Sequence, residues 1–118
     1  MADNKGGKTA ENTAALFFRL HGFNIVERNY ITGRGTGAGE IDLIVRRGNL
    51  LVFVEVKKRR CLDGAAYAIK PVQQQRIWKA AEAFVENHPE YQNSDIRFDA
   101  FLFVSWRSFQ HIPDAWRL

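Results

Sequence analysis

The sequence has few of the features that stabilise secreted or membrane proteins. Its single cysteine, Cys61, excludes an internal disulfide framework and a cysteine-based zinc site. No apolar run approaches the roughly 20 residues that a membrane-spanning helix needs, and the amino terminus lacks the apolar core of a signal peptide. We therefore expect a cytoplasmic protein that does not associate with a membrane.

The remaining composition is that of one globular domain. The chain has 118 residues, of which 46% are hydrophobic and 25% are charged, which suffices for one core. Residues 1–8 are polar and rich in glycine and lysine, so we expect them to be disordered and residues 9–118 to form a single domain. The net charge is +4, and four basic residues follow one another at Lys57, Lys58, Arg59 and Arg60.

The stretch 39–57 has the pattern of two strands joined by a tight turn. It is rich in β-branched residues, and Gly48-Asn49 is a two-residue hairpin signal. If these two residues form the loop, counting back places Asp42 opposite Glu55. Because side chains alternate along a strand, the face with these two carboxylates also carries Glu40, Ile44, Leu51, Phe53 and Lys57. The opposite face is apolar and consists of Ile41, Leu43, Val45, Leu50, Val52, Val54 and Val56.

The two opposed carboxylates predict a metal site. Directly opposed residues have Cβ atoms about 4.5–5.5 Å apart, and like charges at that separation destabilise the hairpin. A hard divalent cation removes the repulsion, and Mg²⁺ typically uses one or two carboxylates together with waters and phosphate oxygens. Lys57 lies two residues past Glu55, roughly 6.6 Å along the same face, where it could hold a phosphate or the attacking water. Asp42, Glu55 and Lys57 therefore indicate metal-assisted hydrolysis of a phosphodiester.

These residues also resemble a known signature. Asp42 followed by Glu55-Val56-Lys57 resembles the PD-(D/E)XK nuclease motif. The longer strings 39–44 and 52–57 resemble the bacterial YraN-like family, whose members are predicted to share the fold of archaeal Holliday-junction resolvases. The match covers most of the chain, because it extends to Ala10-Glu11, Arg28-Asn29-Tyr30 and Arg97-Phe98-Asp99. It implies an α/β, restriction-endonuclease-like three-layer fold, with a mixed sheet and a helix–strand–strand–strand–helix–strand core.

The leading hypothesis is a metal-dependent endonuclease that acts on DNA, including branched or junction DNA. Asp42, Glu55 and the Val56 carbonyl would bind Mg²⁺ or Mn²⁺, and Lys57 would orient or deprotonate the water. Glu11 has two interpretations. It is either an acidic residue that complements the helix dipole or an auxiliary metal ligand at the end of an apolar stripe. The pattern favours neither, whereas the family resemblance favours the ligand.

Nucleic-acid contacts are expected from the basic residues near this site. The run Lys58, Arg59 and Arg60 suits a phosphate backbone, although a solvated loop is the simpler alternative. Arg34, in the glycine-rich loop 32–39, is a further candidate, and there an incidental arginine in a flexible turn is the simpler interpretation. The alternative function is a non-catalytic nucleic-acid- or partner-binding module, and RNA or a nucleotide is an alternative substrate. Resolvase-like proteins are expected to be homodimers, but the sequence shows no clear interface patch.

The rest of the chain adds four predicted elements, namely a helix over 9–21, a strand over 23–31, a helix over 71–88 and a strand over 95–104. Relatives usually carry a lysine near Gln73, and its absence argues against a catalytic role for that helix. Asp99 is expected to be a hydrogen-bonded structural carboxylate. Trp106 and Trp116 are expected to pin the tail to the core rather than to stack on bases.

Overall fold

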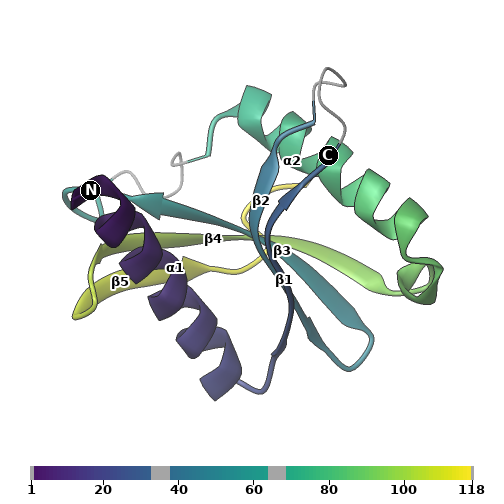
Figure 1. Cartoon of the computed structure of the whole chain (residues 1–118), viewed down its shortest axis with the longest axis horizontal. Helices are drawn as coiled ribbons and strands as arrows, with labels where there is room; N and C mark the ends of the chain where they lie inside the picture. The colour runs from purple at the N-terminus through teal and green to yellow at the C-terminus, as the bar shows by residue number, and fades with distance from the viewer. Residues whose placement is uncertain (1, 33–37, 64–68, 118) are drawn as a thin grey trace.

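A mixed sheet with one helix packed on each face organises the chain (Figure 1). The computed structural model describes residues 2–32, 38–63 and 69–117, and the statements below refer to these ranges. The helices are α1 (Ala2–Leu20) and α2 (Pro71–Asn87), and a 3₁₀ turn (Pro89–Tyr91) follows α2. The strands are β1 (Asn24–Ile31), β2 (Glu40–Arg47), β3 (Leu50–Lys58), β4 (Asp95–Ser105) and β5 (Ser108–Ile112). Neither described helix is long and apolar enough to cross a membrane.

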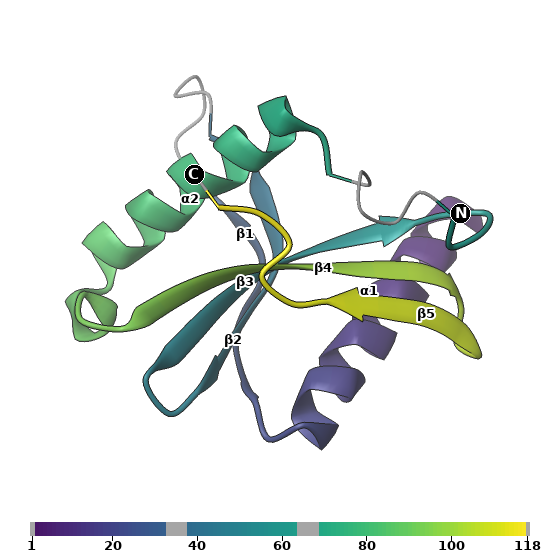
Figure 2. The ribbon, with the colours of Figure 1, turned by 180° about the vertical axis from the view of Figure 1, so that it is seen from behind.

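The strand order in the sheet is β1-β2-β3-β4-β5. The first three strands form an antiparallel meander, β4 runs parallel to β3, and β5 returns antiparallel to β4. A parallel pair needs a long crossover connection, and α2 supplies it by packing across the sheet (Figure 2). The predicted α/β fold with a mixed sheet is therefore confirmed, and β5 is a strand that the sequence did not predict.

The β2–β3 hairpin has the predicted register. Arg47 pairs with Leu50, and the pairing continues without a shift to Leu43 and Val54. Gly48 has a φ of +59°, a left-handed conformation that a two-residue hairpin turn needs and that glycine adopts without strain.

Two apolar clusters lie on opposite faces of the sheet. The α2 cluster contains the helix residues Ile77, Ala80, Ala81 and Phe84, and the strand residues Ile41, Ile44, Leu51, Phe53, Phe98, Ala100 and Leu102. The α1 cluster contains Ala10, Ala14, Ala15, Phe18, Phe23, Leu43, Val45, Val52, Val54, Phe101 and Phe103. Ile41 was predicted to face the α1 side, and that was wrong. The change of face coincides with the end of the β2–β3 ladder at Leu43.

Helix α1 begins at Ala2 in the structure, within the segment 1–8 that was expected to be disordered, and the division into a disordered terminus and one domain over 9–118 stays a prediction. Once a helix is nucleated, each added residue gains a backbone hydrogen bond at little cost, which lets it extend into a segment without an apolar pattern. At the other end of α1, Arg47 Nη1 donates to the His21 carbonyl at 2.9 Å and its guanidinium lies 4.3 Å above the centre of the Phe23 ring. The hairpin thereby fixes the end of α1.

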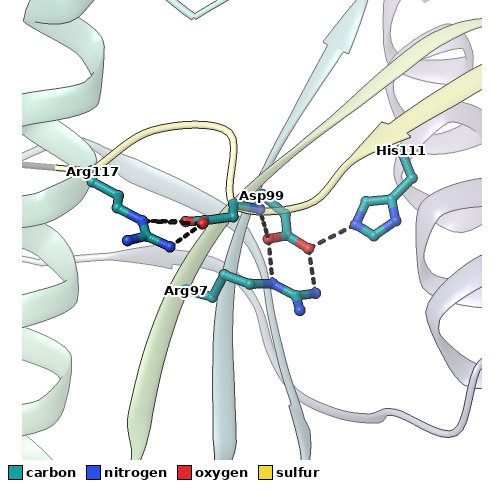
Figure 3. Close-up of polar contacts among 5 residues, drawn as sticks. Arg97, Asp99, His111 and Arg117 are labelled. Carbon is teal, nitrogen blue, oxygen red and sulfur yellow. Dashed lines mark hydrogen bonds and ion pairs between the residues drawn. The ribbon is translucent and has the colours of Figure 1, made fainter.

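The buried carboxylate Asp99 holds the end of the chain (Figure 3). It accepts two hydrogen bonds from Arg97 at 2.8 and 2.9 Å, one from His111 at 2.6 Å and one from the Asp114 backbone N–H at 3.0 Å. Burial opposes ionisation of Asp99, but these four donors outweigh it and lower the pKa of the carboxyl group. The prediction of a structural carboxylate is confirmed, whereas the role of His111 was missed.

The two tryptophans of the tail differ. Trp116 is 6% exposed and stacks on Phe98 with ring centres 5.4 Å apart, so it pins the tail as predicted. Trp106 is 65% exposed, and the prediction that it pins the tail was wrong. It lies in the β4–β5 turn, which projects beyond the paired strands instead of folding back over the core.

Candidate active site

The two predicted carboxylates meet where the β2–β3 ladder ends. The last pair is Leu43 with Val54, and the next residue on each strand is Asp42 or Glu55. Asp42 Oδ2 accepts a hydrogen bond from the backbone N–H of Val56 at 2.8 Å. The Asp42 side chain thus provides a hydrogen bond between the two strands beyond the last backbone pair. The Asp42 carboxyl group is thereby set beside that of Glu55, close enough to raise the pKa of the Glu55 carboxyl group. Asp42 and Glu55 therefore lie next to each other, as the predicted register requires. The contact across the two strands at this point is made by the Asp42 side chain, because the backbone ladder has ended.

The environment of Glu55 strongly favours its neutral form. Glu55 is only 4% exposed to solvent. Burial, followed by the hydrogen bond and the negative charge of Asp42, raises the pKa of Glu55 to about 9, while the charge of Lys57 acts in the opposite direction. At neutral pH and without metal, Glu55 therefore holds a proton.

Helix α2 takes part in this site, which the sequence did not predict. Gln73 Nε2 donates a hydrogen bond to Glu55 Oε2. The absence of a lysine near position 73 had argued against a catalytic role for this helix. The side-chain amide of Gln73 nevertheless reaches the Glu55 carboxyl group. The signal that could have located it is Pro71 at the start of α2, which sets Gln73 in the first helical turn.

A cleft of about 480 Å³ surrounds the carboxylates. Its lining combines two carboxyl groups of the pair with cationic side chains and the start of α2, and comprises Gly39, Glu40, Asp42, Glu55, Val56, Lys57, Lys70, Val72, Gln73, Arg76 and Ile77. Gly39 donates its N–H to the Arg76 carbonyl at 3.0 Å, and a Cβ on Gly39 would lie 3.1 Å from Arg76 Cβ. A glycine at position 39 thus lets β2 begin against α2 and narrows one side of the cleft.

Two further acidic residues lie near the pair. Burial, then the charges of Asp42 and Glu11, raises the pKa of Glu40. The predicted register would also place Glu40 opposite Lys57, but these two described residues form no ion pair, because the ladder that would oppose them stops at Leu43. Glu11 accepts a hydrogen bond from Asn29 at 3.1 Å and lies 3.8 Å from the Arg28 guanidinium. The structure therefore ties Glu11 to β1, at the edge of the acidic group.

The basic run continues from the site to the surface. Lys58, Arg59 and Arg60 are all exposed, and the Arg59 backbone N–H donates to the Phe103 carbonyl at 2.9 Å. This contact places the run beside the end of β4. Arg34 lies outside the described residues.

The donor set fits a hard divalent cation. Among the described residues, no group of three or more acidic, histidine or cysteine side chains is arranged as a complete metal cage. The site instead offers Asp42, Glu55 and the adjacent Val56 backbone, and two carboxylates with open positions suit an ion such as Mg²⁺ that retains waters and takes substrate oxygens. A bound cation would favour the ionised form of Glu55, against the burial and the neighbouring Asp42 that raise the pKa of its carboxyl group.

Comparison with solved structures defines the class of fold. The chain superimposes on Hjc, a Holliday junction resolvase from the archaeal hyperthermophile Archaeoglobus fulgidus, with a TM-score of 0.51, covering 87% of this chain and 72% of that one. The sequence identity is 15%, so the likeness concerns the fold. The mixed sheet flanked by two helices is thus a restriction-endonuclease-like, nuclease-like fold, as predicted.

Comparison of sequences defines the family. Residues 10–103 match the model described as "Uncharacterised protein family UPF0102", and the chain belongs to this YraN-like family. It is 50% identical over 117 residues to a UPF0102 protein of Paramagnetospirillum magneticum, covering 99% of this chain and 91% of the relative. A UPF0102 protein of Rhodopseudomonas palustris strain BisB18 is 48% identical over 109 residues, covering 92% of this chain and 78% of the relative. The family predicted from the motifs is confirmed.

Proposed function

We propose that this protein is a metal-dependent endonuclease that hydrolyses phosphodiester bonds in DNA. The observation that carries the proposal is the Asp42–Glu55 pair, two neighbouring carboxyl groups at the end of a ladder and in a cleft, with the pKa of Glu55 raised to about 9. A buried pair of like-charged groups with a strongly perturbed pKa costs stability and is typical of functional sites. The resolvase-like fold supports the same proposal.

Several residues in and beside the cleft have a role in this proposal. Asp42, Glu55 and the Val56 carbonyl would hold Mg²⁺ or Mn²⁺, which when bound supplies Lewis acidity and a nucleophile at neutral pH. Lys57 orients or deprotonates the attacking water and stabilises charge on the phosphate. Gln73 fixes the orientation of the Glu55 carboxyl group through its hydrogen bond. Glu11 would support the metal through its negative charge, which also raises the pKa of the neighbouring Glu40.

Cleavage assays test the proposal. Purified protein is incubated with linear duplex, branched and single-stranded DNA and with matched RNAs, each with Mg²⁺, Mn²⁺ or EDTA. We expect metal-dependent cleavage of DNA that is abolished in Glu55→Gln. The control Glu90→Gln removes an exposed carboxylate outside the cleft and should cleave like the native protein.

The same assays separate the alternatives. Metal-independent DNA binding without cleavage of any substrate would favour the non-catalytic binding module. Cleavage confined to RNA would assign the carboxylate pair to a ribonuclease.

A further inference from the structure

The tip of the β4–β5 hairpin carries an aromatic side chain that the core does not use. Trp106 and Arg107 form the two-residue turn between these strands. Trp106 is 65% exposed, and the Arg107 guanidinium carbon lies 4.6 Å from the centre of its ring. The Arg107 guanidinium stacks over the indole, and the rest of the exposed ring is available to another aromatic group.

This turn lies beside the basic run that leaves β3. In the parallel β3–β4 register Lys58 pairs with Phe103, and the Arg59 N–H donates to the same Phe103 at 2.9 Å. Ser105, two residues further along β4, is the last residue before the turn. Figures 1 and 2 both show the segment after β3 and the β4–β5 turn at the same end of the sheet.

These residues together form what we call the hairpin-tip surface, defined as Lys58, Arg59, Arg60, Trp106 and Arg107. It combines four positive charges with one exposed aromatic ring, the composition of a site for single-stranded nucleic acid. Positive charge alone would suit any phosphate backbone. The ring adds a preference, because a base already stacked between neighbours in a duplex has no free face to offer it.

We propose that the hairpin-tip surface binds a single-stranded segment of DNA, with one unpaired base stacked on Trp106 and its phosphates held by the four basic residues. The inference rests on the proposed function and narrows it, because it makes the substrate a DNA with unpaired bases next to the cut, such as a branch or flap. The surface continues β3 beyond Glu55 and Lys57, so one strand can contact the cleft and the hairpin tip at once.

The sheet register gives the spacing between the two sites. Glu55 pairs with Ala100, and Ser105 is five residues further along β4, which is about 16 Å at the usual strand rise. Neighbouring nucleotides are about 3.4 Å apart along one strand of a duplex, and a single strand with unstacked bases is more extended. The base on Trp106 is therefore at most about five nucleotides from the phosphate that lies in the cleft.

Equilibrium binding in EDTA tests this surface without any cleavage. The probes are a single-stranded oligonucleotide, a blunt duplex of the same sequence, and that duplex with a single-stranded flap. Trp106→Ala is expected to lower affinity for the single strand and the flap by about 5- to 150-fold, the contribution of one base–aromatic stack, and to leave duplex affinity within about twofold. Trp106→Phe retains a ring and should keep most of the affinity. Trp78→Ala removes another partly exposed tryptophan, on α2, and should bind like the native protein.

The outcomes distinguish this inference from the proposed function. If Trp106→Ala weakens binding to all three DNAs equally, or to none of them, the stacking site is wrong even where the native protein cleaves DNA. If the native protein cleaves nothing but Trp106→Ala selectively weakens single-strand binding, the endonuclease proposal fails and the stacking site stands. If the native protein binds none of the three probes, the stacking site is overturned, and the cleavage assay alone decides the endonuclease proposal.

Discussion

Asp42 accepts the Val56 N–H at the end of the β2–β3 ladder, which sets its carboxyl group beside that of Glu55. Burial, followed by the neighbouring Asp42, raises the pKa of Glu55 to about 9, so the metal-free site retains a proton at neutral pH. A divalent cation and this proton compete for the same oxygens, since metal binding to carboxylates needs them deprotonated. The metal-free and metal-bound states of the site therefore differ in charge, and this difference can be measured.

The first prediction is that the metal-free protein loses stability as the pH rises from 5 to 9. The pKa of Glu55 is raised to about 9 in the folded state from an ordinary value of 4.5. Between these values the folded state holds one proton more than the unfolded state, so the free energy of unfolding falls by about 1.4 kcal/mol per pH unit for this group alone. Urea unfolding in EDTA across this range measures the slope.

A variant shows whether Glu55 causes the slope. Glu55→Gln cannot titrate, so its stability should be nearly constant over the same range. Asp99, whose pKa is lowered, contributes only at the acid end, because its stabilisation disappears as the pH falls through its folded value. A native protein whose stability is flat or rises between pH 5 and 9 would contradict the protonation of Glu55.

Local sequence signals predicted the hairpin and its carboxylates well. Gly48-Asn49 fixes the turn, and the alternation of apolar residues fixes the faces. Ile41 was assigned to the wrong face because strict alternation does not continue beyond Leu43. At that residue the pairing of β2 with β3 ends, although its pairing with β1 continues. Strand β5 was missed because its turn, Trp106-Arg107, contains none of the residues that usually mark a hairpin.

Contacts between distant segments were beyond sequence reasoning. The hydrogen bond from Gln73 to Glu55 depends on how the crossover helix docks on the sheet. Pro71 marks where that helix starts but not which strand its first turn contacts. His111 looked isolated in sequence but reaches Asp99 because β5 pairs with β4. The family resemblance supplied the fold, whereas these partners required the tertiary structure.

The second prediction concerns Gln73. Gln73→Leu removes the donor that orients the Glu55 carboxyl group, so we expect cleavage to fall by at least tenfold, in the range found when groups that orient metal ligands are removed. Gln73→Lys introduces a cation beside Glu55, which should lower its pKa and flatten the dependence of stability on pH. Gln75→Leu changes an exposed glutamine of the same helix and serves as the control. Unchanged cleavage in Gln73→Leu would show that the contact has no catalytic importance.

A third prediction concerns the basic run. Replacing Lys58, Arg59 and Arg60 with alanine should weaken binding to every DNA sequence about equally, because phosphate contacts carry no sequence information. The slope of log affinity against log salt on duplex DNA should also fall by about 0.9 for each phosphate that the variant no longer neutralises. Binding titrations at several salt concentrations measure the slope. An unchanged slope would mean that the run is only a solvated surface.

The last prediction separates an enzyme from a binding module through Asp42→Asn. An asparagine Oδ1 can still accept the Val56 N–H, while the charge next to Glu55 disappears, so metal-free stability should be equal to or up to about 1 kcal/mol above that of the native protein. The native protein should gain about 2.7 kcal/mol from Mg²⁺ or Mn²⁺ at a hundredfold excess over its dissociation constant, and the variant should gain nothing. Cleavage should be abolished and DNA binding retained, because the phosphate contacts belong to other residues. Asp95→Asn, at an exposed strand end, is the matched control and should respond to metal like the native protein. If Asp42→Asn instead destabilises the metal-free fold and the native protein shows no shift with either metal, Asp42 is a structural residue and the binding module is the better description.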